Sequence, residues 1–155
     1  MTHSGAGANA PAPVSRLEWR PAYRIVSSRF PPVGLFDAIA GPGDIEALHE
    51  IEGLTNPRLR EEMGTASLVP AHRRIAGLST TPVMAAFTHP HPEGSWFSSG
   101  SYGVYYAALD RETAIRETVR HRNRYLARTR EPRCHLQMRC YLGDLAGELH
   151  DTRGG

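Results

Sequence analysis

The chain has 155 residues and a net charge of +2, and hydrophobic residues make up 40% of it. One domain with a modest core is expected at this length. The small net charge gives no electrostatic case for nucleic-acid binding, and no apolar run is long enough to span a membrane. All 18 basic residues are arginine. We attribute this mainly to a GC-rich genome, although arginine also suits phosphate and carboxylate ligands.

Residues 1–19 are expected to form a flexible leader, because the first 14 are mostly Gly, Ala, Pro and Ser and lack the core of a signal peptide. Cys134 and Cys140 lie in one predicted strand, roughly 20 Å apart. That is too far for a disulfide, so both are interpreted as buried thiols of a reducing compartment. A cytoplasmic protein is therefore expected.

The predicted elements begin with a strand at residues 22–27, where apolar and polar residues alternate. A helical turn at 36–39 and helices at 44–53 and 56–63 follow, and 64–82 is expected to be irregular. Two more strands are predicted at 83–88 and 102–109. The second is expected to be central in the sheet, because both of its faces are apolar.

Asp110 is predicted to cap a helix that reaches about Thr129. Its expected inner face consists of Ala114, Ile115, Thr118, Val119, Arg122 and Leu126. A last strand at 134–142 alternates, with one apolar face. Strands and helices mix without a regular βαβ rhythm, so the predicted fold class is α+β, a mixed sheet with flanking helices.

Residues 94–117 carry the candidate chemistry. A small polar loop leads into the strand with Tyr105 and Tyr106, and Glu117 follows two turns into the helix. This order places a carboxylate and two tyrosines near one sheet edge, which suits cleavage of a glycosidic bond. Plainer roles are also open: Glu117 as a favourable charge near a helix N-terminus or paired with His121, and the tyrosines as core residues.

Other patterns are weaker. Arg24 lies inside an apolar strand, either on a solvated face or, with Arg29, gripping a pyrophosphate. His89 and His91 have no third or fourth ligand at recognisable spacing, so no metal site is expected. Acidic residues interrupt the charge of the Arg-rich helix at 111–130, which favours a solvated face over a nucleic-acid surface. The glycines of the polar loop match no dinucleotide or P-loop fingerprint.

Taken in order, four short segments of this chain resemble the RES-domain toxins, the toxin halves of Xre–RES toxin–antitoxin pairs. They are residues 23–25 (Tyr-Arg-Ile), 94–100 (Gly-x-x-Phe-Ser-x-Gly), 104–108 (Val-Tyr-Tyr-Ala-Ala) and 114–117 (Ala-x-x-Glu). The resemblance spans roughly residues 20–153, so residues 20–155 are expected to form a RES-like domain.

The resemblance implies a fold similar to ADP-ribosyltransferases and the consumption of NAD. Some members are NAD glycohydrolases or phosphorylases, and others transfer ADP-ribose to a protein. It also implies a helix-turn-helix antitoxin that plugs the site, with no metal, direct nucleic-acid or membrane partner. By position, Arg24, Tyr106 and Glu117 would be catalytic. The residues expected to bind NAD are Arg29, Trp96, Ser98 and Tyr105.

Two departures from the family pattern stand out. Trp96 occupies a position where members usually carry arginine, and a tryptophan stacks on rings but cannot neutralise a phosphate. The family's signature serine lies in a C-terminal segment that would follow Gly155, and the local Ser98 and Ser99 do not take its place. The alternative expectation is therefore an inactive or truncated RES pseudoenzyme that acts as a binding module.

Overall fold

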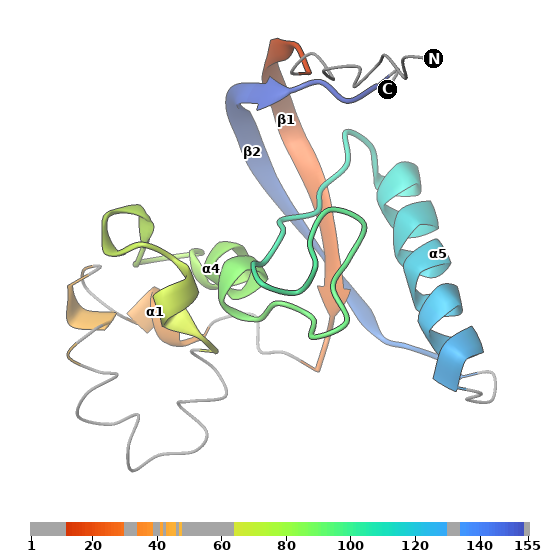
Figure 1. The fold of residues 1–155 in the computed structure, drawn as a ribbon, viewed down its shortest axis with the longest axis horizontal. Helices are drawn as coiled ribbons and strands as arrows, with labels where there is room; N and C mark the ends of the chain where they lie inside the picture. Colours follow the sequence, from red (N-terminus) through yellow and green to blue (C-terminus); the bar gives the residue numbers. More distant parts are fainter. Residues whose placement is uncertain are drawn as a thin grey trace, which may run out of the picture.

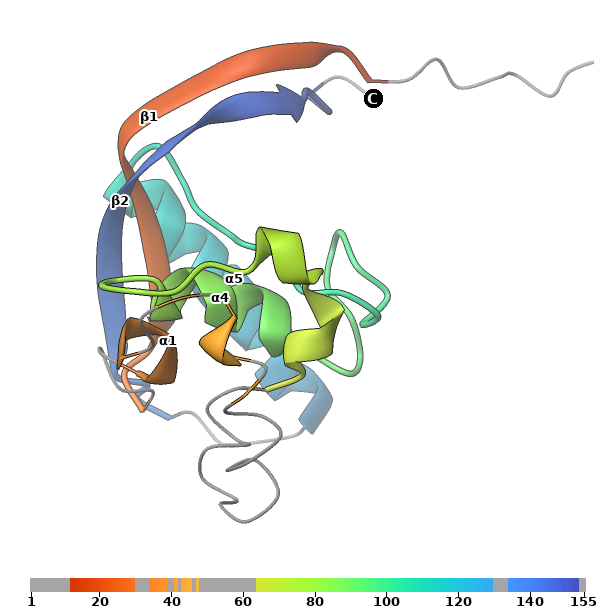
Figure 2. The ribbon, with the colours of Figure 1, turned by 90° about the vertical axis from the view of Figure 1, so that its left-hand side faces the viewer.

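A computed structural model describes residues 12–29, 34–38, 41, 43–45, 47, 64–129 and 134–153. Its framework is a two-stranded antiparallel sheet formed by β1 (Val14–Ser27) and β2 (Met138–His150). The helices lie on one face of this long, curved ribbon, and α4 and α5 flank the segment that connects them (Figures 1 and 2). The α+β class is as predicted, but the described sheet is antiparallel and not the predicted mixed sheet.

Both strands are longer than expected. The predicted strand at 22–27 is the second half of β1, which starts at Val14 and so includes residues 14–19 of the predicted leader. The register shifts between Trp19 and Ala22, next to the cis Arg20–Pro21 bond. β2 starts four residues later than predicted and continues to His150, past the glycines at 143 and 147 that obscure its alternation. Pairing between the two ends of the chain thus outweighs weak local signals.

The other two predicted strands are wrong. Residues 83–88 belong to helix α4 (Thr81–Thr88), which carries Pro82 in its first turn, a favoured position. Residues 102–109 are irregular and join the sheet only where Tyr23 and Ala108 exchange backbone hydrogen bonds of 2.8 and 2.9 Å. Short apolar runs fit a buried helix or a close-packed segment as well as a strand.

A small core joins α4 to α1 (Leu35–Ala38) and the 3₁₀ helix η1 (Ala66–Leu68). Its buried members are Phe36, Ile45, Ala66, Val69 and Met84. The predicted helical turn at 36–39 is confirmed by α1, and 64–82 is mostly irregular as predicted, apart from η1 and η2 (Ala71–Arg73). The predicted helix at 44–53 lies mostly outside the described residues, and the one at 56–63 lies entirely outside them.

Helix α5 (Arg111–Thr129) matches its prediction closely. Asp110 caps it by accepting the backbone N–H of Thr113 at 2.8 Å. Ala114 is buried against the sheet, but Ile115 and Val119 are exposed, contrary to the predicted inner face. The apolar stripe is narrower than expected: α5 packs mainly against β1, and the described part of the sheet has two strands.

The predicted burial of the cysteines is wrong. Cys134 precedes β2 and Cys140 lies within it, and both are exposed and free. β2 belongs to a sheet that, in the described part of the chain, has only two strands and so leaves much of its surface open. The thiols therefore carry no argument about the cellular compartment.

Gly103 is the tightest point between the connecting segment and α4. A Cβ atom there would lie 2.1 Å from the carbonyl oxygen of Ala86 and 2.5 Å from the Cα of Phe87, both backbone atoms. Gly103→Ala should therefore displace the segment and lower the free energy of unfolding by roughly 3 kcal/mol. Chemical denaturation measures this, with Gly143→Ala as the matched control because its Cβ would meet nothing within 4 Å. Equal stability of the two variants would contradict the packing described.

Candidate active site

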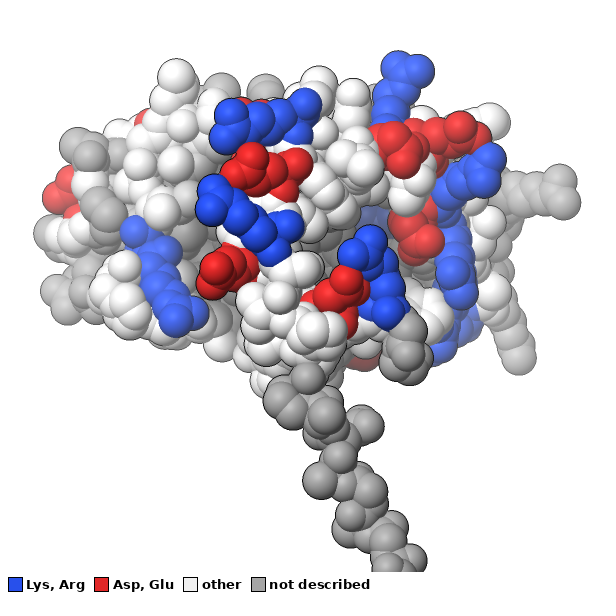
Figure 3. Space-filling view, turned by 90° about the horizontal axis from the view of Figure 1, so that it is seen from above, with Lys and Arg blue, Asp and Glu red and all other residues white. Residues whose placement is uncertain are grey.

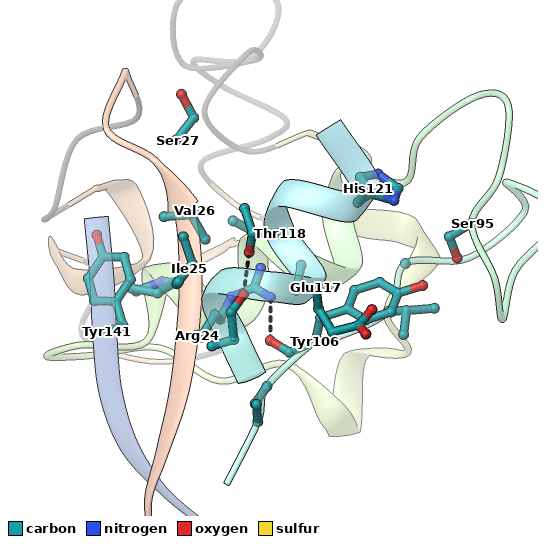
Figure 4. A pocket seen from close by; sticks show the side chains of 18 of the residues that line it. Arg24, Ile25, Val26, Ser27, Ser95, Tyr106, Glu117, Thr118, His121 and Tyr141 are labelled. Atoms are coloured by element: carbon teal, nitrogen blue, oxygen red, sulfur yellow. Dashed lines mark hydrogen bonds between the residues drawn. The ribbon is translucent and has the colours of Figure 1, made fainter. Parts of the chain in front are cut away.

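A cavity of about 1420 Å³ opens between β1, α4, α5 and the segment that connects the two helices. Arg24 from β1, Tyr106 from the connecting segment and Glu117 from α5 all line it (Figure 4). The structure thus brings the three predicted catalytic residues together from three separate elements.

Arg24 is a cation held in place on the cavity wall. Its Nη1 donates to the carbonyl oxygen of Tyr106 at 3.2 Å, and its guanidinium carbon lies 4.5 Å from the ring centre of Tyr105. The Nε atom is buried and has no hydrogen-bond partner among the described residues. Burial lowers the pKa of Arg24, while Tyr105 and Tyr141 oppose that shift. Arginine still keeps its charge, so the site contains a positive group whose donors are mostly unmet.

The two adjacent tyrosines face in opposite directions. Tyr106 is 41% exposed and lines the cavity, with its ring centre 6.2 Å from that of Phe97. Tyr105 does not line the cavity; its ring stacks on Phe87 at 6.5 Å and supports the guanidinium of Arg24. In this structure Tyr105 positions Arg24, and its predicted contact with the cofactor stays a prediction.

Glu117 is exposed on the cavity side of α5. Within the described part of the chain it makes no ion pair, and the alternative pairing with His121 does not form. Burial lowers the pKa of His121, and the nearby charges of Arg122, His91 and Arg124 lower it further. Without an ion pair in the described structure, the carboxylate of Glu117 is available to a ligand.

The other residues predicted to bind NAD differ in how free their side chains are to contact a ligand. Trp96 lines the cavity and is 55% exposed. Ser98 also lines it, but its hydroxyl donates to the carbonyl oxygen of Tyr102 at 2.6 Å and accepts the N–H of Gly100 at 3.1 Å. Ser98 therefore shapes the loop. Arg29 lines the cavity next to the end of β1.

Several residues of the cavity wall are absent from the predicted site, among them Arg120, His121 and Tyr141. Arg120 lies three residues after Glu117 and His121 lies four residues after it, so helical spacing could have identified both. Tyr141 faces Arg24 only through the strand register, in which the two residues are partners. No local signal could have shown that pairing.

Other classes of site find little support in the described residues. They contain no group of three or more His, Cys, Asp or Glu side chains placed to hold a metal ion. None of the described helices is long and apolar enough to cross a membrane. Basic and acidic side chains lie next to each other on the face in Figure 3, which thus offers no continuous basic surface there.

A comparison with protein families gives this geometry a context. The family model of the RES domain matches residues 71–155. The chain belongs to the RES domain family. The match to the RES domain includes Trp96, Tyr106 and Glu117 and begins after the strand that carries Arg24.

A relative supports a longer similarity. The chain is 37% identical over 133 residues to y4oC of Sinorhizobium fredii (strain NBRC 101917 / NGR234), a protein described as uncharacterized. The alignment covers 84% of this chain and 56% of the relative, so this RES protein spans just over half the relative's length. No solved structure matches the chain.

Proposed function

We propose that this RES domain consumes NAD by breaking the bond between nicotinamide and ribose. The observation that carries the proposal is the placement of Arg24, Tyr106 and Glu117 around one cavity. At about 1420 Å³, this cavity exceeds the usual size of a small-molecule site, roughly 300–1000 Å³. It therefore has room for a dinucleotide.

Each residue suits one requirement of the reaction. Nicotinamide leaves as a neutral ring and the ribose gains oxocarbenium character, as in glycoside cleavage. The carboxylate of Glu117 would stabilise that positive charge and hold the 2′-hydroxyl. The exposed ring of Tyr106 would stack on the cationic nicotinamide, and Arg24, joined by Arg29, would bind the pyrophosphate.

The ribosyl group then passes to water, to phosphate or to a protein side chain. An ADP-ribosyltransferase-like fold and a cytoplasmic site of action belong to the same proposal, which requires no metal. A domain that destroys NAD must be restrained in the cell that makes it. We therefore expect a helix-turn-helix antitoxin of the Xre type whose contacts block the cavity.

Expression in a bacterial host tests the toxin role. Induction of the chain should stop growth and deplete cellular NAD, and co-expression of a cognate helix-turn-helix antitoxin should restore both. Depletion of NAD should precede growth arrest, since the first causes the second. Normal growth and unchanged NAD at high levels of folded chain would favour the inactive binding module instead.

A further inference from the structure

Helix α5 presents a stripe of arginines that the proposed reaction leaves unexplained. Arg116, Arg120, Arg124 and Arg128 recur every four residues, so they follow one side of the helix. The outer two form ion pairs. Nη2 of Arg116 lies 2.6 Å from Oε1 of Glu112, and Nη1 of Arg128 lies 3.6 Å from Oε2 of Glu93. The middle two, Arg120 and Arg124, have no such ion pair among the described residues.

The middle two arginines contact an aromatic ring in place of a carboxylate. Their guanidinium carbons lie 5.3 Å (Arg120) and 4.7 Å (Arg124) from the ring centre of Trp96. Among the described residues no carboxylate lies within ion-pairing distance of either, and Glu117, one turn before Arg120, is not its partner. Two like charges thus share one ring without an anion to balance them.

Arg120 and Trp96 are also exposed to the cavity, because both line it. The surroundings are positive: besides its burial, the pKa of His121 is lowered by Arg122, His91 and Arg124. A guanidinium that lies over an aromatic face keeps its N–H groups free around its edge, where they can bind phosphate oxygens two at a time. The arrangement therefore has the hydrogen-bond donors that a phosphate group requires.

We propose that Arg120, stacked on Trp96 and supported by Arg124, forms a second phosphate-binding subsite on the α5 wall of the cavity. Arg24 lies on the β1 wall, so Arg24 and Arg120 hold the pyrophosphate of a nucleotide between them. The choice of a nucleotide as ligand rests on the proposed function. The subsite itself rests on the unpaired arginines.

Binding of ADP-ribose by isothermal calorimetry tests this subsite in the full chain. ADP-ribose has no nicotinamide to lose, so the result does not depend on whether the chain cleaves NAD. Arg120→Gln should weaken binding roughly ten-fold, the usual effect of losing a charge-assisted hydrogen bond. Arg116→Gln is the matched control, because Arg116 belongs to the same stripe but does not line the cavity. Its affinity should equal that of the parent.

Inorganic phosphate, titrated in parallel, separates two sources of the anion. If only phosphate binding depends on Arg120, the subsite serves a free phosphate and the assignment to a nucleotide is overturned. Equal affinities of Arg120→Gln and Arg116→Gln for both probes would overturn the subsite. So would a folded parent chain that binds neither probe.

Discussion

Replacement of Glu117 by glutamine should lower the rate of nicotinamide release from NAD by roughly 100- to 1000-fold, the usual effect of removing one group that stabilises a transition-state charge. Glutamine keeps the shape of the side chain and its hydrogen-bonding atoms but loses the negative charge. The exposed Glu117 has no ion pair in the described structure, so its loss should not affect folding. Initial rates at saturating NAD and thermal unfolding measure the two effects separately.

Glu112→Gln provides the matched control. Glu112 lies on the same helix, is exposed and does not line the cavity. Its ion pair with Arg116 is exposed on both sides and is expected to contribute only about 0.5 kcal/mol. Equal rates for Glu112→Gln and Glu117→Gln would remove Glu117 from the mechanism.

Arg24→Met should reduce turnover of NAD roughly 100-fold while changing the free energy of unfolding by no more than about 1 kcal/mol. Methionine keeps an unbranched side chain at this position but loses the contact of the guanidinium with the ring of Tyr105. It loses the hydrogen bond to Tyr106, but it also removes a buried Nε that has no partner among the described residues. These two changes in stability have opposite signs. NAD turnover and denaturant unfolding are the measurements.

Arg16→Met on the same strand is the control for Arg24. Arg16 is exposed, pairs locally with Glu18 and does not line the cavity. It should leave turnover unchanged. If Arg24→Met unfolds the chain, the guanidinium is a structural group; if the folded variant turns over NAD normally, Arg24 does not bind the substrate.

The elements predicted correctly have strong local signals. Helix α5 follows from the cap at Asp110 and a long polar and apolar periodicity. The runs at 83–88 and 102–109 lack such signals, since four to eight apolar residues fit several structures. Tertiary contacts decide which structure these two segments adopt, above all the close approach of Gly103 to the backbone of α4.

The candidate site was predictable to a similar extent. The ordered resemblance points to Arg24, Tyr106 and Glu117, and the structure places them around one cavity. Trp96 stands where the family usually has an arginine, which suggests that the site lacks a cation there. The fold nevertheless brings Arg120 and Arg124 of α5, a helix later in the sequence, over the ring of Trp96. That contact and the pairing of Arg24 with Tyr141 arise from packing and strand register, which no local pattern encodes.

The central claim is that this chain breaks the nicotinamide–ribose bond of NAD. The most direct test incubates the purified, folded chain with NAD and measures free nicotinamide by chromatography. We expect steady release by the parent chain and almost none by Glu117→Gln. Cleavage of NAD by this chain is ruled out if a folded parent chain releases no nicotinamide with water, phosphate and a cell extract each supplied as acceptor.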